Sequence, residues 1–377
     1  MAAGTRKINN KEEGKTRPST SFIVLEVMVC LLVIYVIDFS PLTGVLYTRA
    51  DDSMKATTTA AALPAVATPA VLDKVAYDKK LLLNANYSVS TSSATSTATS
   101  TAAKRLWPAK APYPLPGALL PYHRIIAYYG NFYSKGMGVL GQYPTAEMIQ
   151  KLQAEVNKWN AADPATPAIP AIDYIAVTAQ GSPGADGKYR FRMPDSQLDH
   201  AVELASQVHG IVILDVQVGL STVQTEVPLL DKYLSMPNVH LALDPEFDMP
   251  GGAKPGSIIG TMSAGEINWA ANHLAQLVRD NHLPPKVLVV HRFTDHMVTN
   301  TNSITPLPEV QVVMDMDGWG PPAKKIGTYT NFIKPYPVQF TGFKLFYKND
   351  LKTPSTRMLT PGELLKLTPQ PLFIQFQ

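Results

Sequence analysis

The sequence predicts a (β/α)8 barrel, and three observations lead to this fold class. From Tyr122 onward, short Val- and Ile-rich runs alternate with helix-like segments, which is typical of parallel strands joined by crossover helices. The runs number eight over about 250 residues, the usual size of such a barrel. Acidic and polar residues follow nearly every run, as expected where a barrel carries a site.

The N-terminal part of the chain predicts a membrane anchor. Residues 1–21 are polar and basic, and residues 22–39 form an apolar run about long enough to cross a bilayer. The basic flank predicts a cytoplasmic N-terminus and an extracellular C-terminal domain, hence a single-pass protein of the cell membrane. A cleaved signal peptide is the alternative, although no small-x-small cleavage site directly follows the run.

Residues 40–120 are expected to form a disordered linker. Ala, Thr, Ser and Pro dominate them, most clearly in Ser88–Ala103. Such a composition buries too little apolar surface to offset the entropy of ordering. The weakly apolar stretch Val71–Leu83 is expected to form at most a transient helix. The barrel is then assigned to residues 121–377.

Composition limits the functional classes. The net charge is +3, and the expected barrel shows no basic stripe with interleaved aromatics, so nucleic acid is not an expected partner. The single cysteine, Cys30, excludes an intramolecular disulfide. No glycine-rich phosphate loop follows the first strand, which disfavours an open doubly wound sheet, the alternative fold. We expect no cofactor.

The eight expected strands share short, apolar, β-branched runs. They are Ile125–Tyr129, Tyr174–Ala179, Ile211–Val216, Val239–Asp244, Val287–His291, Val310–Asp315, Gly342–Tyr347 and Leu372–Phe376.

The expected helices lie between these strands. The best of them, Ser263–Asn281, has a serine cap with Glu266 three residues later, as in a capping box. Gln377 directly follows the eighth strand, so we expect no regular last helix and assign the cover of that face to Leu106–Leu120. The other helices are Thr145–Trp159, Asp195–Val208, Thr222–Leu234, Thr294–Asn300, Pro322–Phe332 and Thr360–Lys366.

The stretch Val239–Asp248, which reads VHLALDPEFD, is the centre of the functional prediction. An apolar run of strand length is followed by Asp244, a helix-stopping proline and Glu246. Carboxylates that face each other across a small cavity repel, so one takes a raised pKa and can serve as a general acid. An acid paired with a base or nucleophile is the equipment that cleaves glycosidic bonds.

The predicted site collects residues from the C-terminal ends of the strands. At the opposite ends we expect ordinary surface residues, namely His123, Arg124, Lys286 and Lys344. The candidate catalytic residues are Glu246, Asp244, Asp317 and Asp315, and the candidate substrate-binding residues are Tyr129, Gln180, Asp215, Gln217, His291, Trp319, Tyr347 and Gln375.

Two other chemistries fit the sequence less well. His291 with Asp215, Asp244 and Asp315 would suit a metal-dependent hydrolase, but His291 stands nearly alone, so no metal site is assigned. Ser-His-Asp catalysis is disfavoured because no G-x-S-x-G turn is present.

The strand-end motifs resemble those of known glycosidases. Asp244-Pro245-Glu246 is similar to the D-x-E of chitinase-like (family 18) enzymes, and Val313–Asp317 resembles their sixth-strand M-x-Y-D. Leu243–Glu246 also resembles the L-D-x-E of family 25 muramidases. The resemblance to family 18 implies that Glu246 is the acid, Asp244 its orienting partner and Asp317 a further site residue.

The region from Tyr122 to Gln377 as a whole resembles uncharacterised exported barrel proteins of actinomycetes and their relatives, through its Y-Y-G, L-D-x-Q and L-D-P-E elements. The leading hypothesis is a membrane-tethered barrel that hydrolyses a polysaccharide, such as a cell-wall glycan. A barrel of the cell envelope that binds glycan or protein without catalysis is the first alternative. A metal-dependent hydrolase is the second.

Overall fold

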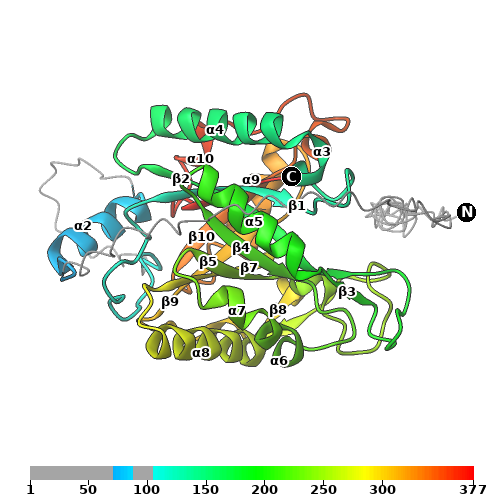
Figure 1. The fold of residues 1–377 in the computed structure, drawn as a ribbon. Helices are drawn as coiled ribbons and strands as arrows, with labels where there is room; N and C mark the ends of the chain where they lie inside the picture. The colour runs from blue at the N-terminus through cyan, green and yellow to red at the C-terminus, as the bar shows by residue number, and fades with distance from the viewer. Residues whose placement is uncertain (1–70, 88–104) are drawn as a thin grey trace, which may run out of the picture. The chain divides into compact units, whose positions relative to one another are not determined.

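A computed structural model describes residues 71–87 and 105–377. Eight parallel strands close into a barrel, because each pairs with the next along the chain and the last pairs with the first (Figure 1). This confirms the predicted barrel and excludes the open sheet. The strands are β1 (Arg124–Gly130), β2 (Ala168–Ala179), β4 (Ile211–Val216), β5 (Val239–Leu243), β7 (Lys286–Arg292), β9 (Val310–Met316), β10 (Phe340–Leu345) and β11 (Phe373–Phe376).

Three shorter strands lie outside the barrel ladder. β3 (Arg190–Arg192) pairs antiparallel with the end of β2 and so extends from the C-terminal end of the barrel. β6 (Met262–Ser263) and β8 (Val298–Thr299) pair with each other.

The helices cover the outside of the barrel, with α4 and α8 on opposite sides in Figure 1. Helix α8 has the predicted capping box, in which Ser263 and Glu266 satisfy each other's backbone donors, and it buries Ile267 and Leu274. The helices are α2 (Lys74–Ala85), α3 (Val139–Gln142), α4 (Thr145–Ala162), α5 (Asp195–Gln207), α6 (Val223–Glu226), α7 (Asp231–Leu234), α8 (Ala264–Asp280), α9 (Pro322–Phe332) and α10 (Pro361–Leu364), with 3-10 turns η1 (Val227–Leu230), η2 (Pro245–Phe247), η3 (Asp295–Met297), η4 (Thr301–Ser303) and η5 (Asn349–Leu351).

Two helix predictions are wrong. The stretch 222–234 is three short turns, α6, η1 and α7, because Pro228 has no N–H to donate to a continuous helix. The stretch 294–300 is η3 followed by β8. Its residues instead pair with Met262 and Ser263 beside the start of α8.

The barrel has two buried apolar layers, one inside the strands and one between the strands and the helices. Inside it, side chains from alternate positions of the strands form a small cluster that includes Ala127, Ile213, Val289 and Val313. The intervening strand residues point outward and join a much larger cluster with the helices. The period of two along each strand therefore separates a barrel interior from a barrel–helix layer.

The N-terminal end of the barrel is closed by residues that the sequence assigned to the linker. Leu120 belongs to the inner cluster, and Leu81 of α2 packs against it. Asn84 and Asn86 donate to the backbone of Gln370 and Leu367, respectively, both at 2.8 Å. In Figure 1, α2 lies at the opposite end of the barrel from β3.

The linker prediction is therefore wrong for residues 71–87 and 105–120, which have defined structure packed against the barrel. The prediction that Leu106–Leu120 covers the face beside the last strand is also wrong. The backbone N–H groups of Leu119 and Leu120 donate to Gln311 Oε1 at the N-terminal end of the barrel instead. The basic tail, the predicted anchor at 22–39 and Cys30 lie outside the described residues. Within the described ranges, no helix is long and apolar enough to cross a membrane.

Candidate active site

A ring of polar side chains lies directly above the apolar interior of the barrel. Each of its members follows an inward-facing strand position by two residues, as Asp215 follows Ile213 and His291 follows Val289, so it also faces inward. We name these eight residues the polar ring: Tyr129, Asp173, Asp215, Asp244, His291, Asp315, Lys344 and Gln375.

His291 joins two strands across the ring. Its Nε2 lies 2.9 Å from Asp215 Oδ2 and its Nδ1 lies 3.1 Å from Asp315 Oδ2, and all three side chains are fully buried. Burial alone would lower the pKa of His291, but its hydrogen bonds with the two carboxylates outweigh burial and hold that pKa well above its ordinary value. Since both ring nitrogens face carboxylates, His291 is an imidazolium that donates from each of them.

Asp317 lies between two cations. Its Oδ1 is 3.0 Å from Lys344 Nζ, and its Oδ2 is 3.6 Å from His291 Nδ1. The ammonium of Lys344 also lies 4.0 Å from the centroid of the Tyr129 ring. Burial acts to lower the pKa of Lys344, but the carboxylates of Asp317 and Asp244 outweigh it and raise that pKa. Lys344 is therefore a buried cation rather than a neutral amine.

Glu246 is positioned by the turn that ends β5. Asp244 Oδ1 accepts a hydrogen bond from the backbone N–H of Glu246 at 3.1 Å, which closes the turn that Pro245 begins. Gln217 donates to Asp244 Oδ2 at 3.1 Å and to the Tyr129 hydroxyl at 3.2 Å. Each oxygen of the Asp244 carboxylate thus accepts a hydrogen bond, and the bond from the Glu246 N–H fixes the backbone of Glu246.

The carboxyl groups of the site retain protons to unusually high pH. Burial, followed by the charges of Asp244 and Asp317, raises the pKa of Glu246 to about 8. Burial and the charge of Asp215 raise the pKa of Asp244 to about 7 and that of Asp173 to about 8. Neighbouring acids in a poorly hydrated space cannot all be ionised, so the site holds acids and carboxylates together at neutral pH.

The structure brings most of the predicted residues together at one end of the barrel, but three lie apart. Tyr347 points outward, and its hydroxyl contacts the hydroxyl of Tyr128 at 3.0 Å and Glu155 of α4 at 3.2 Å. Trp319 is half-buried in the loop after β9, with Lys352 5.1 Å from its ring centroid. Gln180 lies at the turn into β3, where its backbone N–H bonds Tyr189.

Sequence reasoning missed two members of the polar ring. Asp173 accepts a 2.5 Å hydrogen bond from Gln375 inside the barrel. It was overlooked because β2 begins at Ala168, whereas the prediction began the strand at Tyr174. Lys344 was assigned to the surface. The inward period of β10, read from Phe340 through Gly342, could have revealed it.

The other basic residues expected at the surface are also buried, apart from the half-buried His123. Arg124 bonds Asp163 at 2.9 Å and lies 5.1 Å from the Trp159 ring centroid. Lys286 donates to the backbone carbonyls of Met236 and Val239. Burial lowers its pKa to about 7. The expectation of ordinary surface residues at this end is therefore wrong.

The arrangement does not have the form of a metal centre. Among residues 71–87 and 105–377, no group of three or more His, Cys, Asp or Glu side chains has a geometry that could hold a metal ion. Both nitrogens of His291 are already engaged with carboxylates.

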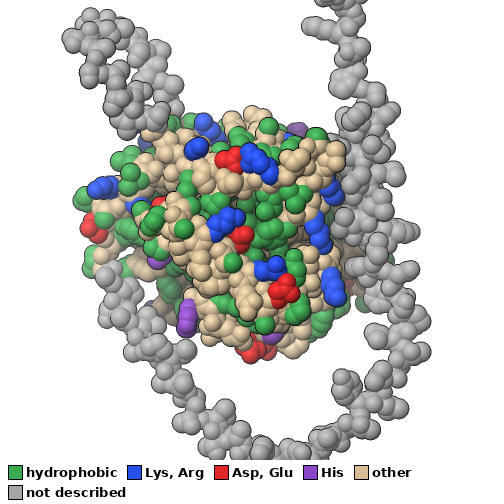
Figure 2. All heavy atoms as spheres, turned by 90° about the horizontal axis from the view of Figure 1, so that it is seen from above, with side chains coloured by type: hydrophobic (Ala, Val, Ile, Leu, Met, Phe, Trp, Pro, Cys, Tyr) green, Lys and Arg blue, Asp and Glu red, His purple; other side chains and the backbone are tan. Residues whose placement is uncertain are grey.

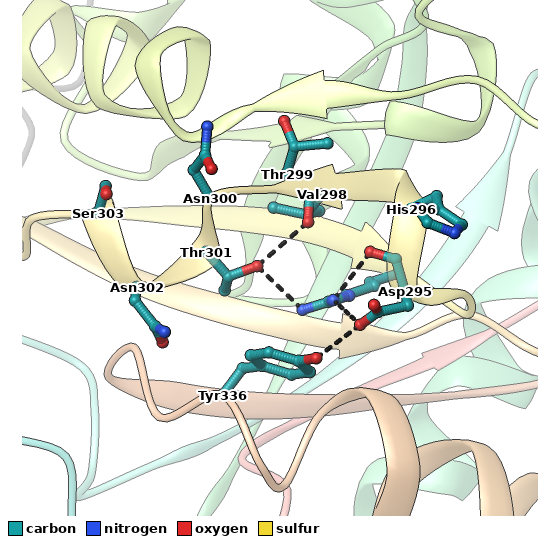
Figure 3. Close-up of a pocket in the computed structure, with 10 residues that line it drawn as sticks. Asp295, His296, Val298, Thr299, Asn300, Thr301, Asn302, Ser303 and Tyr336 are labelled. Atoms are coloured by element: carbon teal, nitrogen blue, oxygen red, sulfur yellow. Dashed lines mark hydrogen bonds and ion pairs between the residues drawn. The ribbon is translucent and has the colours of Figure 1, made fainter.

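A cavity of about 400 Å³ opens on the segment between β7 and β9 (Figure 3). Arg292 is one of its lining residues and donates to Thr301 Oγ1 at 3.1 Å and to Asp295 Oδ1 at 3.0 Å. The Arg292 guanidinium also lies 4.3 Å from the ring centroid of Tyr336. No member of the polar ring lines this cavity, so it is separate from the candidate active site.

No protein-family model matches the chain, and no curated protein matches it. Among solved structures, a ruminal GH26 endo-β-1,4-mannanase is similar at 11% identity and a TM-score of 0.33, over 67% of this chain and 58% of that one. A Podospora anserina GH26-CBM35 β-(1,4)-mannanase is similar at 12% identity and a TM-score of 0.29, over 59% of this chain and 54% of that one. The chain thus spans a little over half of each. Similarity at this level carries no argument about substrate or mechanism.

Proposed function

We propose that the barrel hydrolyses glycosidic bonds of a glycan, with Glu246 as the general acid. One observation carries the proposal. Glu246 follows Asp244 at the C-terminal end of the barrel, which we call the barrel mouth, and burial together with the charges of Asp244 and Asp317 raises its pKa to about 8, which favours the protonated acid at neutral pH. A proton donor next to an ionised carboxylate is the pair that glycoside hydrolysis requires.

The proposed reaction divides the work between two carboxyl groups. Glu246 gives its proton to the glycosidic oxygen as the bond from that oxygen to the anomeric carbon breaks, and the bonding electron pair stays with the oxygen. Asp317, Asp315 or Asp244 supplies the second carboxylate, which either bonds to the anomeric carbon or takes a proton from the attacking water. Asp315 is fully buried and Asp317 is 7% exposed, which favours Asp317 for contact with substrate.

Other side chains near the mouth are proposed to bind the sugar. Tyr129 and Gln217 offer hydroxyl and amide groups to sugar hydroxyls, whereas Gln180 and Trp319, which lie apart from the polar ring, are left out of the binding set. We assign Asp215, His291 and Gln375 to the support of the site, since they are fully buried below its mouth. Tyr347 is left out of the binding set because its hydroxyl is engaged with α4.

We also propose that the barrel works outside the cell membrane. The support comes from the sequence, in which a basic tail and an apolar run of spanning length precede the barrel. An anchored barrel of the envelope suits a polysaccharide substrate such as a cell-wall glycan. The likeness of Asp244-Pro245-Glu246 to family 18 and family 25 motifs supports the same substrate class.

The experiment is a Glu246→Gln substitution assayed on a panel of polysaccharides, with new reducing ends as the readout. We expect the wild type to cleave at least one glycan and the variant to lose about 10²- to 10⁴-fold in rate, because the amide has no proton to give. Glu203→Gln, an exposed change on α5, is the matched control. Undiminished turnover by Glu246→Gln would show that Glu246 is not the general acid. Binding of a glycan without cleavage by the wild type would favour a non-catalytic barrel.

A further inference from the structure

The polar ring contains one buried cation for which the proposed reaction gives no role. Lys344 is 3% exposed and extends from β10 into the barrel, where its ammonium meets Asp317. Buried ion pairs are weak evidence for stability, because the attraction between the charges barely repays their desolvation. A lysine kept in a ring of acids therefore calls for a functional explanation.

The contacts of Asp317 show what Lys344 does there. One carboxylate oxygen is 3.0 Å from Lys344, and the other is 3.6 Å from the imidazolium of His291. Asp317 therefore has a cation at each oxygen. Glu246 has none within ion-pairing distance among the residues that the structure describes.

The remaining ionisable groups around Asp317 are five residues on four elements. Asp244 and Glu246 lie at the end of β5, Asp315 precedes it on β9, Tyr129 lies on β1, and Lys325 of α9 is close enough to interact through space. The neighbouring carboxyls disfavour a negative charge on Asp317, and Lys325 is already paired with Asp350 at 2.6 Å. The two cations at the oxygens are thus what favours that charge.

We infer that Lys344 is a positioning residue that, together with His291, keeps Asp317 ionised and so makes Asp317 the anionic partner of Glu246. This inference rests on the proposed function and deepens it, since it decides which of three candidate carboxylates acts. The ammonium itself lies 4.0 Å from the centroid of the Tyr129 ring, a cation–π contact that helps to hold it beside the Asp317 carboxylate. Asp315 and Asp244 then support the site.

The protonated state of Lys344 excludes a competing role for it. A lysine that forms a Schiff base needs a free amine, which desolvation can supply by lowering its pKa. At Lys344 the neighbouring carboxylates raise the pKa instead. Lys344 is therefore a fixed charge and not a nucleophile.

The test compares Lys344→Met with Lys344→Arg, and Lys348→Met, an exposed change in the loop after β10, is the matched control. In Lys344→Met we expect kcat/KM to fall about 10²-fold and the acid limb of the pH–rate profile to move to higher pH, because the carboxylate loses its partner. Lys344→Arg keeps the charge and should retain the position of that limb. Lys344→Gln serves as the neutral variant if the methionine does not fold.

A second readout needs no substrate. In protein labelled with ¹³C at the aspartate carboxyls, the Asp317 signal is assigned by its loss in Asp317→Asn. At pH 6 we expect this signal to report an ionised carboxylate in the wild type and in Lys344→Arg, and a largely protonated carboxyl in Lys344→Met. The same ionised signal in folded Lys344→Met or Lys344→Gln would overturn the inference. Because no glycan is present, this result is independent of whether the barrel cleaves one.

Discussion

Glu246 and Asp317 carry opposite parts of the proposed chemistry, although both are carboxyl side chains at one barrel mouth. Their surroundings make the difference. Asp317 has a cation at each oxygen, whereas the half-buried Glu246 has the carboxyls of Asp244 and Asp317 as its nearest charges. At the residue scale, burial and neighbouring charge decide which group holds a proton.

This difference predicts the pH dependence of hydrolysis. Glu246 must be protonated to act, and its pKa is raised to about 8, so activity should be lost as the pH rises through about 8. Asp244→Asn removes one of the charges that raise this pKa, so its alkaline limb should move to lower pH. Initial rates between pH 5 and 10 check both expectations. A rate that stays level up to pH 10 would contradict the assignment of Glu246.

Individual residues also show how much of the site could be predicted from the sequence. Sites in such barrels lie at the C-terminal ends of the strands. The structure accordingly brings together four residues that follow or end clearly predicted strands: Asp244, Glu246, His291 and Asp317. Asp173 and Lys344 lie inside strands, where a charged residue is normally read as facing solvent. Only closure of the barrel turns these positions inward, and closure depends on pairing between distant segments.

At the scale of elements, Gly342 of β10 makes room for the ring. A Cβ at this position would overlap Asp315 Oδ1 and lie 2.9 Å from Phe373 Cδ1. The absence of a side chain thus lets the Asp315 carboxylate lie against β10 while it accepts from His291. One glycine therefore couples strand packing to the charge network.

Gly342→Ala is expected to destabilise the protein by about 1–3 kcal/mol, because the added methyl forces Asp315 or Phe373 to shift. Gly327→Ala in helix α9 is the matched control, since nothing lies within 4 Å of the added methyl. The control should stabilise the protein by about 0.5–1 kcal/mol, as Ala does in a helix. Urea unfolding measures both changes. Equal effects of the two variants would contradict the packing argument.

Element types were predicted well where one local signal dominated. Helix α8 was predicted with a serine cap and a capping box, and both are present. The stretch 294–300 was misassigned because its state depends on pairing with Met262 and Ser263, which are remote in the chain. Local periodicity carries no information about such a partner.

At the scale of the whole molecule, the barrel is closed at its N-terminal end by α2 and by Leu119 and Leu120. The polar ring lies toward the other end of the barrel interior, where its charged side chains are at most 3% exposed. On the face shown in Figure 2, several basic side chains lie beside acidic ones. The composition of the stretch before the barrel predicted a linker, since Ala, Thr, Ser and Pro dominate it. The contacts that order parts of it are made by isolated side chains such as Tyr77 and Leu81.

Two truncations test the role of α2. A variant lacking residues 1–70 should unfold as cooperatively as the full chain. A variant lacking residues 1–104 loses the buried Tyr77 and the hydrogen bonds of Asn84 and Asn86, so its free energy of unfolding should fall by about 3 kcal/mol. Urea unfolding distinguishes the two. Equal stability of both variants would show that α2 does not support the barrel.

Cell fractionation tests the proposed anchor. The full chain should sediment with membranes, and a variant lacking residues 1–39 should not, because the apolar run at 22–39 is then absent. Protease added to intact cells should digest the barrel of the full chain. A full chain found in the supernatant, or a barrel protected from protease, would contradict the proposed location.

The roles of Glu246 and Asp317 are tested most directly by a crystal structure of the Glu246→Gln variant with an oligosaccharide of the glycan that the wild type cleaves best. We expect a sugar ring above the polar ring, with the glycosidic oxygen within hydrogen-bonding distance of the amide at position 246 and the anomeric carbon facing Asp317. A sugar bound only in the cavity between Arg292 and Tyr336, with the barrel mouth empty, would contradict this expectation.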